Sequence, residues 1–326
     1  MPSLEPVGHA DIVGRALPGE LGAVEVSGLD PARHAGDAGI GEWLQALLWR
    51  HAVVCLRLDR KLTDPELRAV VALIGEVKDP VGDDESGRPV QYSEARQIID
   101  AGFVMTDELR EVIGDVTVGG DDERPGLFQF FHTDDSYVAC PAVATVLHAR
   151  QLPPGGGGDT QFIDMRDAYA QLPADQRDRV IGRCAGHAYN NDDAFPPRES
   201  ARGELEVLRR VAHPIVRAHP VTGVPALYFD LDRATHIEGM PVAEGRALLQ
   251  ALQDEAELHA ARYSHRWRDH DVLLWDNASV QHRASGDFEV GAPRRFWRYM
   301  VTGPAPRPFV PGEVSERGGA APTGPR

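Results

Sequence analysis

Two residue types that commonly bind transition metals lie close together near the middle of the chain. The segment FQFFHTDDSY contains His132 and Asp134, and residues two apart on a β-strand point to the same face. One imidazole and one carboxylate, completed by a distant histidine, would leave three positions open on an octahedral Fe(II). His282, in WDNASVQHRAS, is the candidate for this third ligand. The HxD pattern alone also arises by chance, and a single histidine is more often a hydrogen-bonded structural residue.

Three further segments accompany this candidate metal site, and one of them contains residues that could hold a carboxylate beside it. The run GGGGDT ends at Thr160, although a glycine run can equally be a plain hairpin turn. The segment 213–230, HPIVRAHPVTGVPALYFD, indicates two strands around a PVTG turn. The segment PRRFWR contains Arg294 and Arg298, and a guanidinium group is the natural partner of a carboxylate. The arginine pair is therefore harder to explain as structural than the other two segments.

The combination of these motifs resembles the taurine and 2,4-dichlorophenoxyacetate dioxygenase family of Fe(II)/2-oxoglutarate enzymes. The matching pieces are, in chain order, HTD at 132–134, GGDT at 157–160, HPxxRxHPxTGxxALY at 213–228, WDN at 275–277, His282, Arg294 and Arg298. The resemblance implies a double-stranded β-helix core and Fe(II) bound by the His–Asp–His triad. It also implies 2-oxoglutarate and O₂ as cosubstrates, oxidation of an unactivated C–H bond, and release of CO₂ and succinate.

The resemblance further implies which residues hold the organic ligands. Thr160 and Arg294 match the positions that bind the distal carboxylate of 2-oxoglutarate, and Arg295 is the adjacent alternative. Arg298 matches the arginine that, in the taurine enzyme, meets the anionic group of the substrate. Tyr137 is a further candidate for contact with the ligand.

The chain departs from the taurine enzyme where that enzyme contacts its substrate. Asp79 and Gly82 stand where a histidine and a tyrosine are expected, and Phe128 replaces a polar residue four positions before the HTD motif. We therefore expect a larger, partly apolar substrate with an acid group for Arg298, in secondary metabolism or acid catabolism, and not taurine. Hydroxylation is the default outcome, and desaturation or cyclisation depends on how the substrate lies.

The elements that must position these residues are expected to be mainly strands. The run 53–58 indicates a buried strand, and Thr63-Asp64-Pro65-Glu66 is a typical helix start. From residue 143 onward short apolar strands recur, interrupted by helical stretches over 165–181 and 241–263. This pattern predicts an α+β fold, mainly β, with a jelly-roll core decorated with helices.

The domain organisation follows from composition along the chain. We predict one oxygenase domain over residues 1–302, in which the Asp-, Gly- and Pro-rich stretch 79–126 forms an active-site lid or loop region. The remaining residues, 303–326, are dense in proline and glycine and are expected to form a C-terminal tail.

Overall charge and cysteine content exclude several classes of protein. The chain of 326 residues has 34 basic and 50 acidic residues and a formal charge of −16, which disfavours binding to nucleic acid or anionic membranes. Its three cysteines form no CxxC pattern, so neither a disulfide framework nor a zinc knuckle is indicated. No signal peptide or membrane span is predicted. We expect a cytoplasmic enzyme with a small-molecule substrate, and the subunit count, including a homodimer or homotetramer, stays open.

Two other classes of function compete with the oxygenase. A zinc hydrolase or a cupin-like binding protein could use the same three ligands, because zinc also accepts two imidazoles and a carboxylate. A hydrolase, however, has no need of a carboxylate clamp formed by Arg294 and Thr160 beside the metal. A purely structural or interaction role is the third option, supported by the loop-rich region 79–126.

Overall fold

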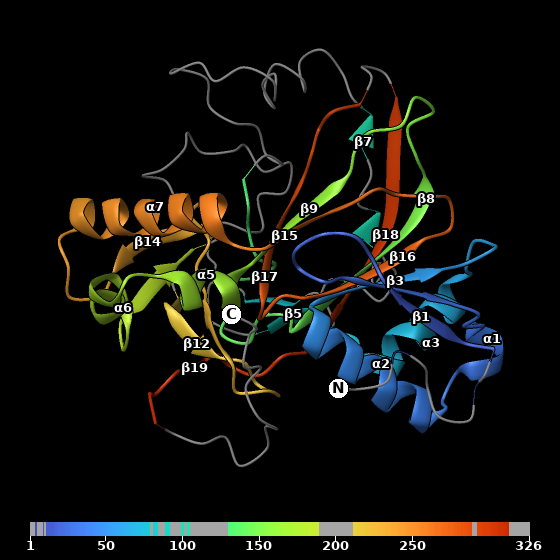
Figure 1. The fold of residues 1–326 in the computed structure, drawn as a ribbon, viewed down its shortest axis with the longest axis horizontal. Helices are drawn as coiled ribbons and strands as arrows, with labels where there is room; N and C mark the ends of the chain where they lie inside the picture. Colours follow the sequence, from blue (N-terminus) through green and yellow to red (C-terminus); the bar gives the residue numbers. More distant parts are fainter. Residues whose placement is uncertain are drawn as a thin grey trace.

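The computed structural model describes residues 11–78, 130–188, 211–288 and 292–312, together with Leu4, His9 and the backbone of four short strands between 81 and 104 (Figure 1). Asp79, Phe128, most of the predicted lid region and residues 313–326 lie outside the described residues. The four short strands are β4 (Val81–Asp83), β5 (Pro89–Gln91), β6 (Ile99–Asp100) and β7 (Phe103–Val104).

One large mixed sheet forms the first half of the molecule. Its strands lie in the order β1-β2-β3-β16-β8-β18-β6, with β7 also paired to β18. The bounds are β1 (Val13–Ala16), β2 (Val24–Ser27), β3 (Val53–Arg57), β8 (Ala144–Gln151), β16 (Val272–Asp276) and β18 (Pro293–Val301). The central strands VVCLR and VLLWD are buried almost throughout, as expected for strands that are covered on both faces. Among the strand pairs that the structure describes in this sheet, β2–β3 is parallel and the others are antiparallel.

The three N-terminal helices are α1 (Pro31–His34), α2 (Ala38–His51) and α3 (Asp64–Ile74). Two of them, α2 and α3, pack on this sheet and share its apolar core, while the short helix α1 packs against α3. The predicted start of α3 is confirmed, because Thr63 is its N-cap and Glu66 accepts a hydrogen bond from the Thr63 backbone N–H at 2.8 Å. This reciprocal arrangement satisfies amide groups that would otherwise lack partners at the helix end.

Three small sheets and three helices form the second half. The sheets are β15-β9-β17, β11-β10-β14 and β13-β12-β19. Their strands are β9 (Thr160–Asp164), β10 (Cys184–His187), β11 (Val211–Pro214), β12 (Val216–Ala218), β13 (Pro225–Leu227), β14 (Ala234–Ile237), β15 (Arg262–His265), β17 (Val280–Ala284) and β19 (Arg307–Pro308). The helices α5 (Met165–Gln171), α6 (Ala174–Val180) and α7 (Val242–His259) share a second apolar core with them. Figure 1 places β9, β15 and β17 between the two groups of helices.

The sequence anticipated the main elements of this half and missed one. The predicted hairpin within 213–230 is confirmed as the antiparallel pair β12–β13. The first part of the predicted tail does not run free: Arg307 and Pro308 pair with β12, and Phe309 packs against the second core. The arrangement of sheets and helices is α+β, as predicted. Among the described residues, no helix is both long and apolar enough to span a bilayer.

Candidate metal centre and carboxylate site

The two candidate metal-binding histidines face each other across a backbone bridge. His132 and His282 form an isolated antiparallel bridge, with N–H···O distances of 3.0 and 2.9 Å in the two directions. His282 lies on β17, whereas His132 lies just before a turn that contains Asp134. The expectation that His132 and Asp134 share a regular strand is therefore wrong, because only His132 makes a bridge. The turn nevertheless brings the Asp134 carboxylate beside both rings.

The three side chains could hold one metal ion. One ligand atom from each of His132, Asp134 and His282 lies within 4.8 Å of the other two. His282 Nε2 is 3.9 Å from Asp134 Oδ2, and the two imidazole centroids are 4.3 Å apart. His132 Nδ1 lies 3.1 Å from the carbonyl of Phe130, and donation to this carbonyl leaves a lone pair on Nε2 for a metal.

The protonation states of these residues also suit a metal. Burial acts to raise the pKa of Asp134, but His282, Arg298 and His132 lower it to about 2. Burial is the main reason why the pKa of His282 falls to about 3. The carboxylate is therefore ionised and the imidazole is neutral at pH 7, which are the forms that bind a cation. The residues present fit a divalent metal.

A chain of buried hydrogen bonds fixes the orientation of Asp134. The Trp275 indole N–H donates to Asn277 Oδ1 at 2.9 Å, and Asn277 Nδ2 donates to Thr145 Oγ1 at 2.8 Å. Thr145 Oγ1 in turn donates to Asp134 Oδ2 at 2.6 Å. Sequence reasoning missed Thr145, because it lies on a different strand and belongs to none of the motifs.

A second set of contacts holds the residues that follow Asp134. Asp135 has a left-handed backbone conformation, with φ of 59°. Lys78 Nζ donates to Asp135 Oδ2 at 2.6 Å and to the Cys140 carbonyl at 2.9 Å. The hydroxyl of Tyr137 donates to Asp135 Oδ1 at 3.2 Å. The structure therefore places Tyr137, a predicted substrate contact, in the network that holds this turn.

Thr160 lies on the same face of the sheet as His282. In the β9–β17 register, Phe162 is opposite His282 and Thr160 is opposite Ala284. Residues that face each other in an antiparallel pair point to one side, as do residues two apart on a strand. The Thr160 side chain is therefore about 7 Å along the strand from the position opposite His282.

The side chain of Arg294 reaches the same place from β18. Its Nε donates to the Gly158 carbonyl at 2.9 Å, and its Nη2 lies 3.4 Å from Thr160 Oγ1. Arg294 is only 5% exposed, and burial lowers its pKa to about 10 although Asp159 and Asp287 counteract this. It is still charged at pH 7, and it forms no ion pair with any carboxylate of the described residues. A buried cation without a counterion is costly unless a ligand supplies the anion.

The glycine-rich loop fits closely around Arg294. Gly156, Gly157 and Gly158 all have positive φ, between 71° and 81°. A Cβ atom on Gly158 would lie 2.9 Å from Arg294 Cδ and Nε. Asp287 Oδ1 accepts the Gly158 N–H at 2.7 Å and also accepts the Ser285 hydroxyl. The backbone conformation therefore favours glycine at these positions, and Gly158 also leaves room for the Arg294 guanidinium. The loop is thus more than a plain hairpin turn.

The other two predicted arginines lie in different surroundings. Arg295 is exposed on β18, whereas its neighbour Arg294 is buried. Arg298 is partly buried, and its Nη1 lies 3.5 Å from Asp134 Oδ1. Thr160 and Arg294 are therefore brought together, and Arg298 lies at the candidate metal centre.

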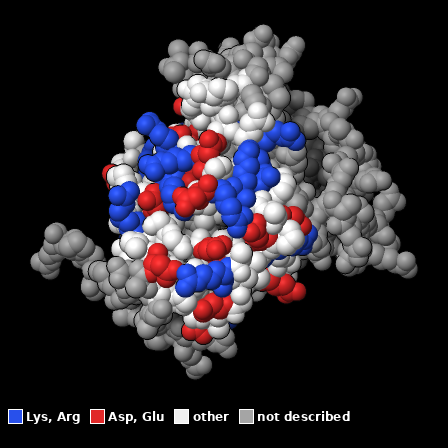
Figure 2. All heavy atoms as spheres, turned by 90° about the vertical axis from the view of Figure 1, so that its right-hand side faces the viewer, with Lys and Arg blue, Asp and Glu red and all other residues white. Residues whose placement is uncertain are grey.

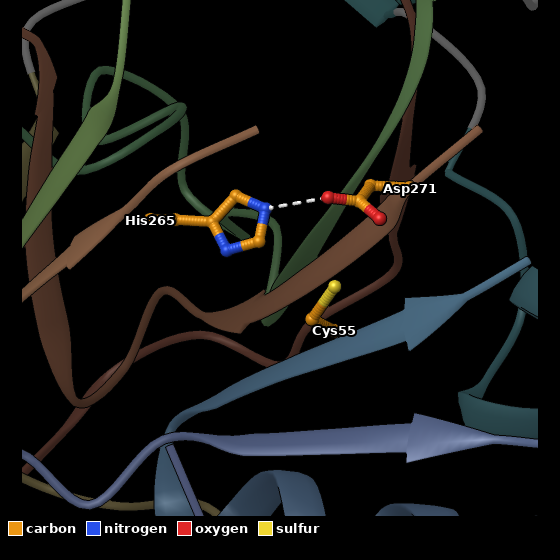
Figure 3. A group of neighbouring side chains, drawn as sticks. All are labelled: Cys55, His265 and Asp271. Atoms are coloured by element: carbon orange, nitrogen blue, oxygen red, sulfur yellow. Dashed lines mark hydrogen bonds and ion pairs between the residues drawn. The ribbon is translucent and has the colours of Figure 1, made fainter. Parts of the chain in front are cut away.

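A second group of potential metal ligands consists of Cys55, His265 and Asp271 (Figure 3). All three are fully buried, and His265 Nε2 lies 3.2 Å from Asp271 Oδ2. The same carboxylate oxygen also accepts from Arg57 Nη1 at 2.5 Å and from the Arg268 backbone N–H at 2.8 Å. Asp271 thus already has a cationic partner, and this group is best described as a buried ion-pair network.

Comparison with known proteins identifies the family of this chain. Residues 14–300 match the family model described as Taurine catabolism dioxygenase TauD, TfdA family. The alpha-ketoglutarate-dependent 2,4-dichlorophenoxyacetate dioxygenase of Cupriavidus pinatubonensis is 34% identical over 60% of this chain. That match covers 64% of the relative, slightly less than two thirds of its length. Pentalenolactone F synthase of Streptomyces avermitilis is 27% identical over 88% of this chain and 92% of its own.

Solved structures show the same fold. The crystal structure of AAD-2 in complex with Mn(II) and N-oxalylglycine has a TM-score of 0.68 and 25% sequence identity, and the match covers 92% of this chain and 99% of the other. A putative alpha-ketoglutarate-dependent 2,4-D dioxygenase from Burkholderia xenovorans has a TM-score of 0.63 and 26% identity, covering 89% of this chain and 97% of the other. Since the family match spans nearly the whole chain, the protein belongs to the TauD/TfdA family of dioxygenases.

Proposed function

We propose that the protein is an Fe(II)- and 2-oxoglutarate-dependent dioxygenase, in which His132, Asp134 and His282 bind the iron. The observation that carries this proposal is the buried guanidinium of Arg294. It lies beside Thr160 without a carboxylate partner among the described residues. A dicarboxylate that binds the metal at one end would supply that partner at its other end.

The spacing of the two sites supports this reading. Thr160 and the position opposite His282 are two residues apart on one face of β9, or about 7 Å. This separation suits an extended five-carbon dicarboxylate that reaches from the metal to the guanidinium. Arg294 and Thr160 would bind its distal carboxylate, and the buried surroundings would strengthen that ion pair by excluding water.

The chain's own residues bind and orient the reactants, while the metal supplies the redox chemistry. Iron held by His132, Asp134 and His282 would supply the chemistry that couples oxidative decarboxylation of 2-oxoglutarate by O₂, to succinate and CO₂, to oxidation of a substrate C–H bond. His132 and His282 hold the site from two backbone segments that are bridged to each other. Thr145 keeps the Asp134 carboxylate oriented. We also infer that the strands around this site form the double-stranded β-helix that the family resemblance implies.

The proposed substrate is a small, partly apolar molecule with an acid group. Arg298 is partly exposed and lies at the metal-site carboxylate, so an anionic group bound there would place neighbouring C–H bonds near the metal. The relatives are named for a dichlorophenoxyacetate, for sulfate esters and for pentalenolactone F synthesis, which agrees with acid catabolism or secondary metabolism. Succinate release in a screen of carboxylic acids, aryloxy acids and sulfate esters would identify the substrate class. If none of these compounds causes succinate release, the proposal of an acid-bearing substrate is wrong.

A zinc hydrolase remains the competing function, because the three metal ligands suit zinc as well. That reading gives no reason for a buried guanidinium at Arg294 that has no carboxylate partner among the described residues. Calorimetric titration of 2-oxoglutarate into the Mn(II)-loaded protein separates the two, because only the dioxygenase requires binding of this cosubstrate.

The prediction for Arg294 has a matched comparison in its neighbour Arg295. Arg294→Met should weaken 2-oxoglutarate binding at least 100-fold, since about 3 kcal/mol of charge-assisted hydrogen bonding is lost. Arg295→Met, on the exposed side of the same strand, should bind nearly as tightly as wild type. If the wild-type protein fails to bind 2-oxoglutarate, the proposed function is wrong. If Arg295→Met shows the larger loss, the assignment of the clamp is wrong.

A further inference from the structure

The hydroxyl of Thr160 has a second neighbour besides Arg294. The indole N–H of Trp267 donates a hydrogen bond to Thr160 Oγ1 at 3.0 Å. Trp267 and Thr160 are both buried, and Trp267 lies just after β15, the strand that pairs with β9. The contact therefore joins two neighbouring segments directly beneath the proposed carboxylate site.

The donors and acceptors around Thr160 fix the direction of its hydroxyl hydrogen. A threonine hydroxyl has one hydrogen to donate and two lone pairs to accept. Both of its side-chain neighbours, the Trp267 indole and the Arg294 guanidinium, are donors only. Thr160 cannot donate to either, and no acceptor for its hydrogen occurs among the hydrogen bonds of the described residues. The hydrogen is therefore available to a ligand that Arg294 attracts.

We propose that Trp267 is a positioning residue that turns Thr160 into a hydrogen-bond donor for the distal carboxylate of 2-oxoglutarate. By occupying a lone pair of Thr160 Oγ1, the indole N–H directs the hydroxyl hydrogen toward the ligand. This inference rests on the proposed function, because it assumes that a carboxylate binds at Arg294.

The surroundings of Trp267 keep its indole in place. The ring packs against Phe296 at a centroid distance of 4.5 Å and against His265 at 4.7 Å, nearly perpendicular to the latter. Phe296 also lies under the Arg294 guanidinium, 4.3 Å from the ring centroid to Cζ. One phenyl ring therefore contacts both groups that approach Thr160.

The ion-pair network described above supports the other side of the indole. His265 is held by Asp271 through Nε2 (Figure 3). The Tyr263 hydroxyl lies 2.9 Å from the other ring nitrogen, Nδ1. Arg57 fixes the Asp271 carboxylate in turn. This gives the Cys55–His265–Asp271 group a role that needs no metal: it contains the histidine against which Trp267 packs.

The test compares two ligands that differ only in the distal carboxylate, 2-oxoglutarate and 2-oxovalerate. Calorimetric titrations into the Mn(II)-loaded protein give a dissociation constant for each. Trp267→Phe removes the N–H and keeps an aromatic ring in the cavity. We expect it to weaken 2-oxoglutarate binding about tenfold, with less than a twofold change for 2-oxovalerate. Trp49→Phe, a buried tryptophan in the N-terminal core, should change neither constant.

A double-mutant comparison shows whether Trp267 acts through Thr160. Thr160→Val should also weaken 2-oxoglutarate binding selectively, and adding Trp267→Phe to it should cause no further loss. An additive loss, or an equal loss for both ligands, would overturn the proposal. If Trp267→Phe does not fold, Trp267→Met is measured with the same expected selectivity. Failure of wild type to bind 2-oxoglutarate at all would instead refute the proposed function.

Discussion

Asp134 receives a hydrogen bond from Thr145, which in turn accepts one from Asn277. Because the side chains involved are buried, the carboxylate has little freedom to rotate away from the two histidines. Partners of metal ligands that act in this way commonly contribute a factor of about 10 to 100 to metal affinity. The orientation of Asp134 is therefore expected to depend on residues that do not touch the metal.

Replacing Thr145 with valine tests this dependence. Thr145→Val keeps the shape of the side chain but removes the donor to Asp134, so Mn(II) affinity should fall about tenfold in a calorimetric titration. Thr235→Val is the matched control, because Thr235 is also buried and donates a hydrogen bond, to the Gly186 carbonyl. Both of these residues belong to the small sheet β11-β10-β14, whereas Thr145 is on the large sheet. Equal Mn(II) affinities in wild type and Thr145→Val would show that this hydrogen bond does not position the ligand.

The residues that could be predicted from the sequence are those with a motif around them. The three proposed metal ligands, Thr160 and Arg294 were found in this way, and the structure brings them together as two adjoining groups. Thr145 and Trp267 were missed because their partners are 11 and 107 residues away in the sequence and come near only in the folded chain. No local pattern distinguishes a threonine that supports a carboxylate from one that packs in a strand.

At the level of elements, the backbone conformation of the glycine loop before β9 determines how closely the loop approaches Arg294 of the proposed cosubstrate site. Gly156 and Gly158 both have positive φ, so an alanine at either position is strained by about 1 kcal/mol. They differ in surroundings: a Cβ on Gly158 would clash with Arg294, whereas nothing lies within 4 Å of one on Gly156.

This difference makes the two glycines a matched pair. Gly158→Ala should displace Arg294 and weaken 2-oxoglutarate binding about tenfold, in addition to lowering the melting temperature by a few degrees. Gly156→Ala should lower the melting temperature by a similar amount and leave the dissociation constant close to wild type. Similar binding by both variants would mean that the approach of the loop to Arg294 does not matter for the cosubstrate.

Local signals predicted elements well where the deciding contacts are local. The start of α3 follows from Thr63 and Glu66, which bond within one turn, and the β12–β13 hairpin follows from its turn residues. The pairing of Arg307 and Pro308 with β12 could not be predicted, because it joins segments about ninety residues apart in a Pro/Gly-rich stretch. Asp134 was placed on a strand because its HxD spacing matches a two-residue period, whereas the chain turns there.

Basic and acidic side chains are interspersed on the face of the molecule shown in Figure 2. The net negative charge of the chain therefore does not form a uniformly acidic patch on that face. Several charges of the described residues are paired, as in the contacts Arg60–Glu66 at 2.5 Å and Arg33–Asp11 at 2.8 Å. Exposed pairs of this kind contribute little to stability. Buried titratable groups are therefore the stronger source of pH-dependent stability.

His148 is such a group and links the sheet to the N-terminal helices. Its Nε2 accepts the Leu62 backbone N–H at 3.0 Å, and its Nδ1 lies 3.2 Å from the Asp271 carbonyl. This arrangement requires a neutral ring with hydrogen on Nδ1. Burial lowers the pKa of His148 to about 4, with Arg150, His270 and Lys61 acting in the same direction and the Asp271 carbonyl opposing them.

The sign of the pH effect follows from the pKa of about 6.5 in the unfolded chain. Above pH 6.5 both states are neutral at His148, and between pH 6.5 and about 4 only the unfolded chain gains the proton. The free energy of unfolding should therefore fall as the pH is lowered through this window, by roughly 3 kcal/mol from this residue. Urea unfolding of metal-free protein at several pH values measures the slope.

His148→Gln removes the titration while keeping an acceptor and a donor at that position. The variant should be less stable than wild type at pH 8 and should lose less stability between pH 6.5 and pH 4.5. The same slope in both proteins would show that His148 does not contribute to acid sensitivity.

The most direct test of the dioxygenase assignment is anaerobic addition of Fe(II) and 2-oxoglutarate to the purified protein, followed by visible absorption. We predict a weak charge-transfer band that requires both additions and is absent from Asp134→Ala, because the metal and the cosubstrate must bind together at His132, Asp134 and His282. A wild-type protein that shows no band, and forms no succinate when O₂ is admitted with candidate substrates, would contradict the account.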